Sequence, residues 1–232
     1  MKLSILSGGA AAGVVQGLQA QFEKKHACEI HAKFSAVGAM RDLLLAGESC
    51  DLVILTRSMI EGLIQSGHVE EGSIASLGIV RTGVAIKTGD PIPAIANREQ
   101  LLKAFNAAVG IYFPDPEKAT AGIHVYKVLQ QLGLEKTKEA ALHIFPNGAT
   151  AMAAMAASSD AGLIGSTQVT EINITPGVQL VGMLPKEFEL ATDYCLGICT
   201  KGQSRQLAVD FANLVTGTSA ATLRQKIGFE LS

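Results

Sequence analysis

Short apolar runs alternate with helical periodicities through the first third of the chain. The runs at 2–6 (KLSIL), 29–34 and 51–55 each end in small or polar residues, and a segment with apolar residues at helical spacing follows each run. Three successive strand–turn–helix units predict parallel strands whose carboxyl ends carry the three turns. Open α/β sheets bind their ligands at that edge, so we expect the function to lie there.

The same pattern returns in the middle of the chain, most clearly at 109–134. A strand (VGIYF) leads through a proline-containing turn into a helix that opens at Ala119–Gly122. Two similar units follow, with strands expected at HIF (143–145) and GLIG (162–165), and the latter strand is expected to end in a polar turn. The middle of the chain therefore predicts a second parallel sheet.

Two longer extended runs, 76–87 and 188–200, frame this middle block, and two helices are expected to close the chain. A chain that crosses over and returns in this way predicts a two-lobe α/β protein. The expected lobes are 1–81 plus 195–232, and 82–194.

Composition narrows the function classes. The net charge is −2 and the sequence pI is near 6.2, without a dense Lys/Arg run, which argues against a nucleic-acid surface. No apolar run reaches 18 residues, so no membrane insertion is expected. The four cysteines form no C-x-x-C pair and the five histidines are scattered. We therefore expect buried free thiols, no metal and no cofactor.

The turn at 118–122 is a candidate anion site. The N–H groups at a helix start lack intrahelical partners and lie at the positive end of the helix dipole. Thr120 adds a hydroxyl, and Lys118 and His124 add charge. The alternative is an ordinary strand-to-helix connection in which Thr120 only caps the helix. Near the N-terminus, Gly8 and Gly13 have the spacing of a P-loop, but the residues that grip phosphate are replaced by Val14 and Val15.

The candidate ligand-binding residues share a position at a strand-to-helix turn or at a crossing between lobes. They are Ser7, Gly8, Gly9, Ser35, Gly38, Arg57, Arg81, Thr82, Lys118, Thr120, Ser166, Thr167 and Gln168. For the serines and glycines the alternative is a plain tight turn, and for the arginines a solvated or ion-paired surface charge. His124 and Glu171 are the candidate catalytic bases, and a packed or surface residue is the alternative for His124.

The stretches LQAQFEKKHACEIHAKFSAVGAM, AGESCDLVIL, TRSMIEGLIQSGHV and DPEKATAGIHVYKVLQQLGL resemble the molybdate-binding family of ABC-transporter solute-binding proteins. The resemblance implies the two-lobe, type II periplasmic-binding-protein-like fold with a ligand cleft between the lobes. It also implies a small anionic ligand held by hydroxyl and backbone N–H groups without a metal.

The chain departs from this family where the oxyanion is held. The family's two serines fall on Gly9 or Ala10 and on Val37, and its tyrosine contact falls near Gly165–Ser166. Each lost donor to a charged ligand is worth about 1–3 kcal/mol, which disfavours molybdate. A larger anion, such as a di- or tricarboxylate that reaches Arg57, Lys118, Thr120 and Gln168, fits better.

Further stretches, SGGAAAGVV, FSAVGAM, FPNGATAM and STQVTEI, are similar to the branch of this family that includes aconitate isomerase. Two function classes therefore stay open. One is a binding protein for a small polycarboxylate or oxyanion. The other is an isomerase that removes and returns a proton beside a carboxylate and so interconverts cis- and trans-aconitate.

Localisation bears on this choice. Met1-Lys2 leads directly into the first expected strand without a secretory signal, so the sequence as written predicts a cytoplasmic protein. If a signal segment was removed, the protein is periplasmic and an ABC permease becomes its expected partner.

Overall fold

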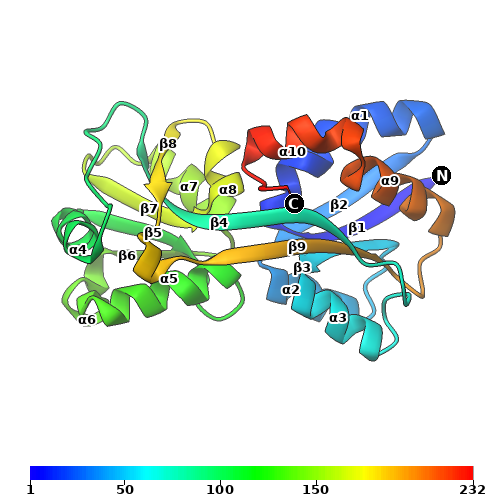
Figure 1. Cartoon of the computed structure of the whole chain (residues 1–232), viewed down its shortest axis with the longest axis horizontal. Coiled ribbons are helices and arrows are strands. Elements are labelled where there is room, and N and C mark those ends of the chain that lie inside the picture. Colours follow the sequence, from blue (N-terminus) through cyan, green and yellow to red (C-terminus); the bar gives the residue numbers. More distant parts are fainter. Residues whose placement is uncertain (232) are drawn as a thin grey trace. The chain divides into compact units, whose positions relative to one another are not determined.

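The computed structural model describes residues 1–231 and divides the chain into two compact units. Unit 1 comprises Met1–Val80 and the chain from Thr192 onward, and unit 2 comprises Arg81–Ala191. The chain passes from unit 1 to unit 2 within strand β4 (Ala75–Lys87) and returns at the start of β9 (Ala191–Ile198). Each of the two expected extended runs thus contains one passage between the units (Figure 1).

Unit 1 is built on a sheet with the strand order β2-β1-β3-β9. Strands β1 (Lys2–Gly8), β2 (Glu29–Ser35) and β3 (Leu52–Thr56) are parallel, and β9 is antiparallel to β3. A 3-10 turn (Gly9–Ala11) and a helix, α1 (Ala12–His26), follow β1. The other two parallel strands lead into α2 (Val37–Leu45) and α3 (Arg57–Gln65). The three predicted strand–turn–helix units are therefore present.

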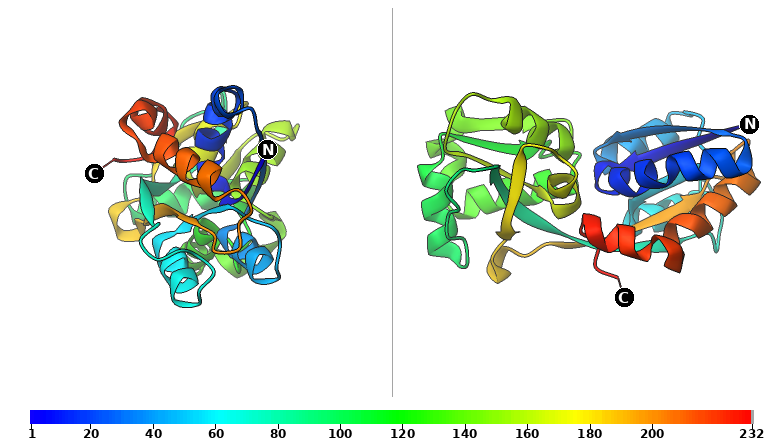
Figure 2. Two further views of the ribbon diagram at one scale, coloured as in Figure 1. Left: turned by 90° about the vertical axis from the view of Figure 1, so that its right-hand side faces the viewer. Right: turned by 90° about the horizontal axis from the view of Figure 1, so that it is seen from above.

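Helices cover both faces of the unit 1 sheet. α1 lies on one face with α9 (Arg205–Thr216) and α10 (Ala221–Ile227), and α2 and α3 lie on the other, as the left view of Figure 2 shows. The apolar side of α1 buries Phe22, whose ring packs edge-on against Phe211 of α9 with centroids 4.9 Å apart. Because both faces are covered, the residues of β3 are all buried.

Unit 2 has the strand order β4-β7-β5-β6, and β8 (Val178–Met183) pairs with β4. Strands β5 (Gly110–Pro114), β6 (Leu142–Phe145) and β7 (Leu163–Gln168) are parallel, whereas β4 is antiparallel to β7. The carboxyl ends of β5, β6 and β7 therefore lie at one edge.

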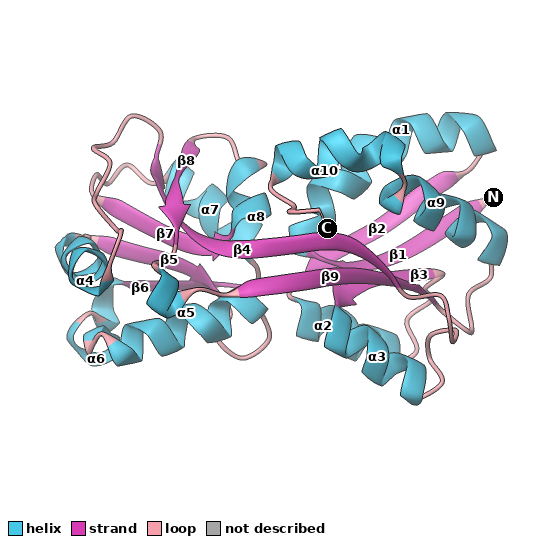
Figure 3. Cartoon of the chain, in the orientation of Figure 1, coloured by secondary structure: helices cyan, strands magenta, loops and turns pink. Residues whose placement is uncertain are grey.

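Helices cover both faces of the unit 2 sheet (Figure 3), and each face has its own hydrophobic core. On one face α4 (Arg98–Ala107), α5 (Thr120–Gln131) and the short α6 (Leu134–Thr137) pack against Val84, Ile111 and Ile164. On the other face α7 (Gly148–Ala157) and α8 (Val169–Asn173) pack against Ala85, Tyr112 and Leu163. We call these the α5 face and the α7 face. Their side chains alternate along each strand, as the two-residue period of a strand requires.

Three sequence expectations need correction. Ser166–Gln168 belong to strand β7 and do not form a turn, because β7 lies inside the sheet with its polar side chains buried. The strand in the second long run begins later than expected, since Lys186–Phe188 form a 3-10 turn and β9 begins at Ala191. Strand β8 and helix α6 were not predicted; β8 is half-buried on both sides and shows no clean alternation.

Candidate functional site

The carboxyl edge of the unit 1 sheet brings together several predicted residues. Gly8 at the end of β1 is the register partner of Ser35 at the end of β2. Ser7 is fully buried, and its hydroxyl donates to the Gly8 carbonyl at 2.9 Å. Gly9 and Gly38 are buried in the first turns of the helices that follow. No side chain caps α1, α2 or α3, whose N-cap residues are Ala11, Ala36 and Thr56.

Gly8 is required by a close approach of neighbouring side chains. A Cβ at this position would lie 2.6 Å from a methyl group of Val37 and 3.4 Å from the ring of Tyr194. Val37 is 3% exposed and packs over the end of β1. It stands at one of the two positions where the resemblance places a serine of the family. Little space is therefore left beside the end of β1, and apolar side chains line part of it.

Arg57 is the first residue of α3, and its Nε donates to Asp193 Oδ2 at 2.7 Å. This hydrogen bond and the Asp193 charge raise the pKa of the Arg57 guanidinium. Asp193 also accepts from the Ser76 hydroxyl. Arg57 is thus ion-paired within unit 1, and Asp193 is a partner that sequence spacing could not reveal.

In unit 2 the start of α5 is open. Its N-cap is Ala119 and no side chain caps it, so the reading of Thr120 as an N-cap is wrong. The side chain that organises this turn is Asp115, which lies before the helix. Its Oδ1 accepts from the N–H groups of Glu117 and Lys118 at 2.7 and 3.0 Å and fixes the turn. Gly122 lets this turn pack closely, because a Cβ there would collide with the carbonyl oxygens of Asp115 and Pro114.

Two buried polar side chains lie beside each other at the same sheet edge. Thr82 of β4 and Gln168 of β7 are register partners, 1% and 2% exposed. The Thr82 hydroxyl and both polar atoms of the Gln168 amide have no hydrogen-bond partner. A buried polar group without a partner costs about 1–3 kcal/mol, so such a pair is a strong sign of a ligand or water that completes it.

Strand alternation places this pair on the α5 face. Val84 and Ile164, two and four residues away along their strands, belong to the α5 face core. Tyr112 of β5 is level with Gly165 of β7, so the residue after the end of β5 is level with Gln168. Gln168, Thr82 and the start of α5 therefore lie at one edge and on one face. We call this the α5-start site.

The start of α7 is closed from within the chain. Thr167 donates to Glu171 Oε2 at 2.6 Å, and the same carboxylate accepts from the backbone N–H groups of Gly148, Ala149 and Gln168. The Asn147 side chain accepts from the Thr150 N–H, which completes a capping box. Burial raises the pKa of the Glu171 carboxyl, and these four donors oppose that shift. Thr167 and Glu171 thus form one cluster on the α7 face.

The other predicted residues of unit 2 have internal partners. Ser166 donates to the Gly83 carbonyl at 2.9 Å, and Arg81 forms an ion pair with Glu189. His124 Nε2 lies 2.7 Å from the Phe188 carbonyl; since a carbonyl only accepts, this nitrogen donates. Lys118 is exposed and Thr120 is half-buried.

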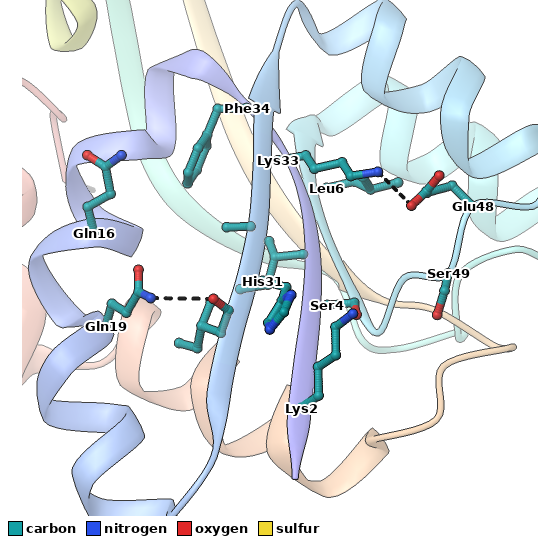
Figure 4. Close-up of a pocket in the computed structure, with 13 residues that line it drawn as sticks. Lys2, Ser4, Leu6, Gln16, Gln19, His31, Lys33, Phe34, Glu48 and Ser49 are labelled. Carbon is teal, nitrogen blue, oxygen red and sulfur yellow. Dashed lines mark hydrogen bonds and ion pairs between the residues drawn. The ribbon is translucent and has the colours of Figure 1, made fainter.

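A further cavity lies in unit 1, away from these residues. It has a volume of about 620 Å³ and is lined by residues of β1 and β2 together with α1 and the segment after α2 (Figure 4). Lys33 in this groove pairs with Glu48 at 2.7 Å, and the Gln19 amide reaches the Ile30 carbonyl. None of the sequence-predicted ligand residues lines it.

Residues 1–231 contain no group of three His, Cys, Asp or Glu side chains suited to a metal ion. None of the helices in that range is long and apolar enough to span a membrane.

The chain belongs to the family described as bacterial extracellular solute-binding protein, whose model matches residues 3–230. It is 25% identical to an aconitate isomerase from a Pseudomonas species over 236 aligned residues, which cover 98% of this chain and 87% of that protein. Among solved structures it is similar to the periplasmic molybdate-binding protein of Azotobacter vinelandii, with a TM-score of 0.79, 17% identity and 99% coverage of both chains. The sulfate-binding protein SubI from Mycobacterium tuberculosis H37Rv is also similar, with a TM-score of 0.74, 14% identity and coverage of 99% and 86%.

Proposed function

We propose that this solute-binding protein binds a small organic di- or tricarboxylate and that the α5-start site holds one of its carboxylates. The observation that carries the proposal is the pair of unpartnered buried side chains, Gln168 and Thr82, at the edge where α5 begins without a cap. The first N–H groups of α5, the Thr120 hydroxyl and the Gln168 amide together supply donors to an anion.

The donor set favours a carboxylate over a compact oxyanion. Gln168 offers an amide N–H and an amide oxygen side by side, which suits a ligand that carries both acceptor and donor groups, such as a carboxylate beside a hydroxyl or an acid. In unit 1, Gly9 or Ala10 and Val37 carry no hydroxyl at the positions where the resemblance places the family's two serines. Lys118, which is exposed next to the start of α5, supplies charge for a further carboxylate.

The second candidate function is isomerisation of aconitate, which the 25% identical relative favours because the match spans 98% of this chain. Such a reaction needs a base beside the substrate carbon. Glu171 is enclosed by four donors, so His124 is the better candidate of the two. Its Nε2 donates to Phe188, which leaves Nδ1 as the nitrogen that could exchange a proton.

The two functions differ in location and partner. A binding protein of this extracellular family would work outside the cytoplasmic membrane and deliver its ligand to an ABC permease. An isomerase would need no permease.

The experiment is a thermal-shift and calorimetric comparison of cis-aconitate, trans-aconitate and citrate with molybdate and sulfate. A ligand at 100 times its Kd stabilises the folded chain by about 2.7 kcal/mol, which is readily measured. Stabilisation by carboxylates is the expected result, and tight molybdate binding without a carboxylate effect would contradict the proposal. Incubation with cis-aconitate in heavy water, followed by NMR, then separates the functions: conversion with deuterium incorporation identifies the isomerase.

A matched pair of threonine variants tests the α5-start site. Thr120→Val should lower carboxylate affinity with little loss of stability, because Thr120 caps nothing. Thr150→Val on α7 should cost about 1 kcal/mol of stability and leave affinity unchanged, because Thr150 belongs to the capping box. If instead Thr150→Val lowers carboxylate affinity and Thr120→Val lowers only stability, the anion binds at the start of α7.

A further inference from the structure

Two buried thiols that are distant in sequence meet in unit 1. Cys50 lies just before β3 and Cys199 just after β9, and each is 3% exposed. Their side chains are hydrogen-bonded to each other. The antiparallel pairing of β3 and β9 continues up to them, since the Cys199 N–H donates to the Asp51 carbonyl at 2.9 Å.

Both thiols line one pocket of about 240 Å³. Polar groups of His68, Thr200 and Gln203 line the same pocket. A small polar reagent can therefore reach the pair without unfolding the unit. Neither thiol takes part in the proposed ligand site.

The hydrogen bonds of the two thiols indicate which sulfur reacts first. Cys50 Sγ donates to the Leu52 carbonyl at 3.1 Å. The hydrogen bond to Cys50, followed by burial, raises the pKa of the Cys199 thiol. The raised pKa makes Cys199 a poor attacking sulfur, so we assign the first step of the exchange to Cys50.

We propose that Cys50 and Cys199 are a modification site that forms a reversible intramolecular disulfide by exchange with a low-molecular-weight disulfide. Cys50 loses its proton and attacks the reagent, which breaks the reagent's S–S bond, releases one thiol and leaves a mixed disulfide on Cys50. Cys199 then loses its proton, attacks Cys50 Sγ and releases the second thiol. The two protein thiols are oxidised and the reagent is reduced to two thiols.

The positions of the two cysteines predict how a disulfide between them would change stability and carboxylate affinity. The chain between the two cysteines contains all of unit 2, so the cross-link would close a long loop, and long loops give large stabilisation in the chain-entropy account. The pair lies at the amino end of β3, whereas the candidate edge of unit 1 lies at its carboxyl end, at Thr56. Oxidation should therefore stabilise the protein and leave carboxylate affinity unchanged.

The test is native oxidation of the full chain with oxidised glutathione, followed by thiol counting in denaturant and peptide mass mapping. We expect two of the four thiols to disappear, with the loss of two hydrogen atoms in mass and a Cys50–Cys199 cross-linked peptide. We also expect the unfolding midpoint to rise by on the order of 5–10 °C and to fall back on reduction.

Cys28→Ala is the matched control, because Cys28 is buried and its pKa is raised chiefly by burial and by the Glu23 charge, not by a second thiol. This variant should still lose two thiols, whereas Cys50→Ser should form no cross-link. Retention of all four thiols by the native protein, a stable glutathione adduct on Cys50, or a cross-link between other cysteines would each overturn the proposal. Since ligand affinity is measured separately, failure here leaves the proposed function to its own test.

Discussion

The starts of α5 and α7 lie at the same edge of the unit 2 sheet but differ in how their first N–H groups are satisfied. At α7 the Glu171 carboxylate and the Asn147 side chain accept from these groups. At α5 no side chain caps the helix, and two unpartnered polar side chains, Thr82 and Gln168, lie on its face of the sheet. A carboxyl group of the chain itself occupies one helix start, and we propose that the other binds an anion from outside.

The two faces of β7 carry this difference. Thr167 points to the α7 face and bonds to Glu171, whereas Gln168 points to the α5 face, where its side-chain amide has no hydrogen-bond partner among the described residues. We propose that these neighbouring residues of one strand have a structural role and a ligand-binding role, respectively. Changes on the α7 face should alter stability, and changes on the α5 face should alter binding.

The largest effect is expected from Gly122→Val, which would force a side chain into the carbonyl oxygens of Pro114 and Asp115. Overpacking of this kind costs about 1–3 kcal/mol or more and would displace the start of α5, so binding should be lost as well. Urea unfolding and calorimetry measure the two effects. Gly62→Ala in α3 is the control, since nothing lies within 4 Å of its added Cβ and helix propensity should raise stability by about 0.5–1 kcal/mol. If Gly122→Val binds carboxylate with normal affinity, the start of α5 is not part of the ligand site.

Gln168→Leu should uncouple stability from binding. Removing a buried amide that has no partner relieves an unpaired polar group, so the free energy of unfolding should stay constant or rise. Carboxylate affinity should fall at least tenfold, or about 1.4 kcal/mol. Thr167→Val, the adjacent residue on the other face, should show the opposite pattern because it removes a donor to Glu171. Equal losses of stability in both variants would remove the distinction between the two faces.

Glu171→Gln should change how stability depends on pH. The pKa of Glu171 is raised in the folded chain, so its contribution to stability is present below the unfolded pKa near 4.5 and is lost as pH rises through the folded pKa. The difference in free energy of unfolding between wild type and variant should therefore move in favour of the variant as pH increases above about 4.5. Urea titrations at several pH values measure this difference, and a trend in the opposite direction would mean that the four donors outweigh burial.

Arg57→Ala should have the smallest effect. The Arg57–Asp193 pair is exposed, and such pairs contribute about 0–1 kcal/mol to stability. Loss of this cation should change carboxylate affinity little, because the α5-start site is built from residues of unit 2. A loss of affinity as large as that of Gln168→Leu would make Arg57 a direct ligand contact.

The sequence predicts the strand–helix units well because strong apolar periodicity determines them. It does not predict the end of β7, since Ser166, Thr167 and Gln168 are typical of a turn and only burial between two neighbouring strands explains them as strand residues. Nor does it predict how the start of α7 is satisfied. That depends on Glu171, which comes more than twenty residues after Gly148 and meets it only in the folded chain. Local spacing carries no signal for such a contact.

The most direct test is a titration of the full chain with cis-aconitate, followed residue by residue through its backbone amide NMR signals. The account predicts that the N–H signals of Thr120, Ala121 and Gly122 shift with ligand concentration, together with the side-chain amide of Gln168, while those of Gly148 and Ala149 stay constant. Shifts at Gly148 and Ala149 with none at the start of α5 would contradict it.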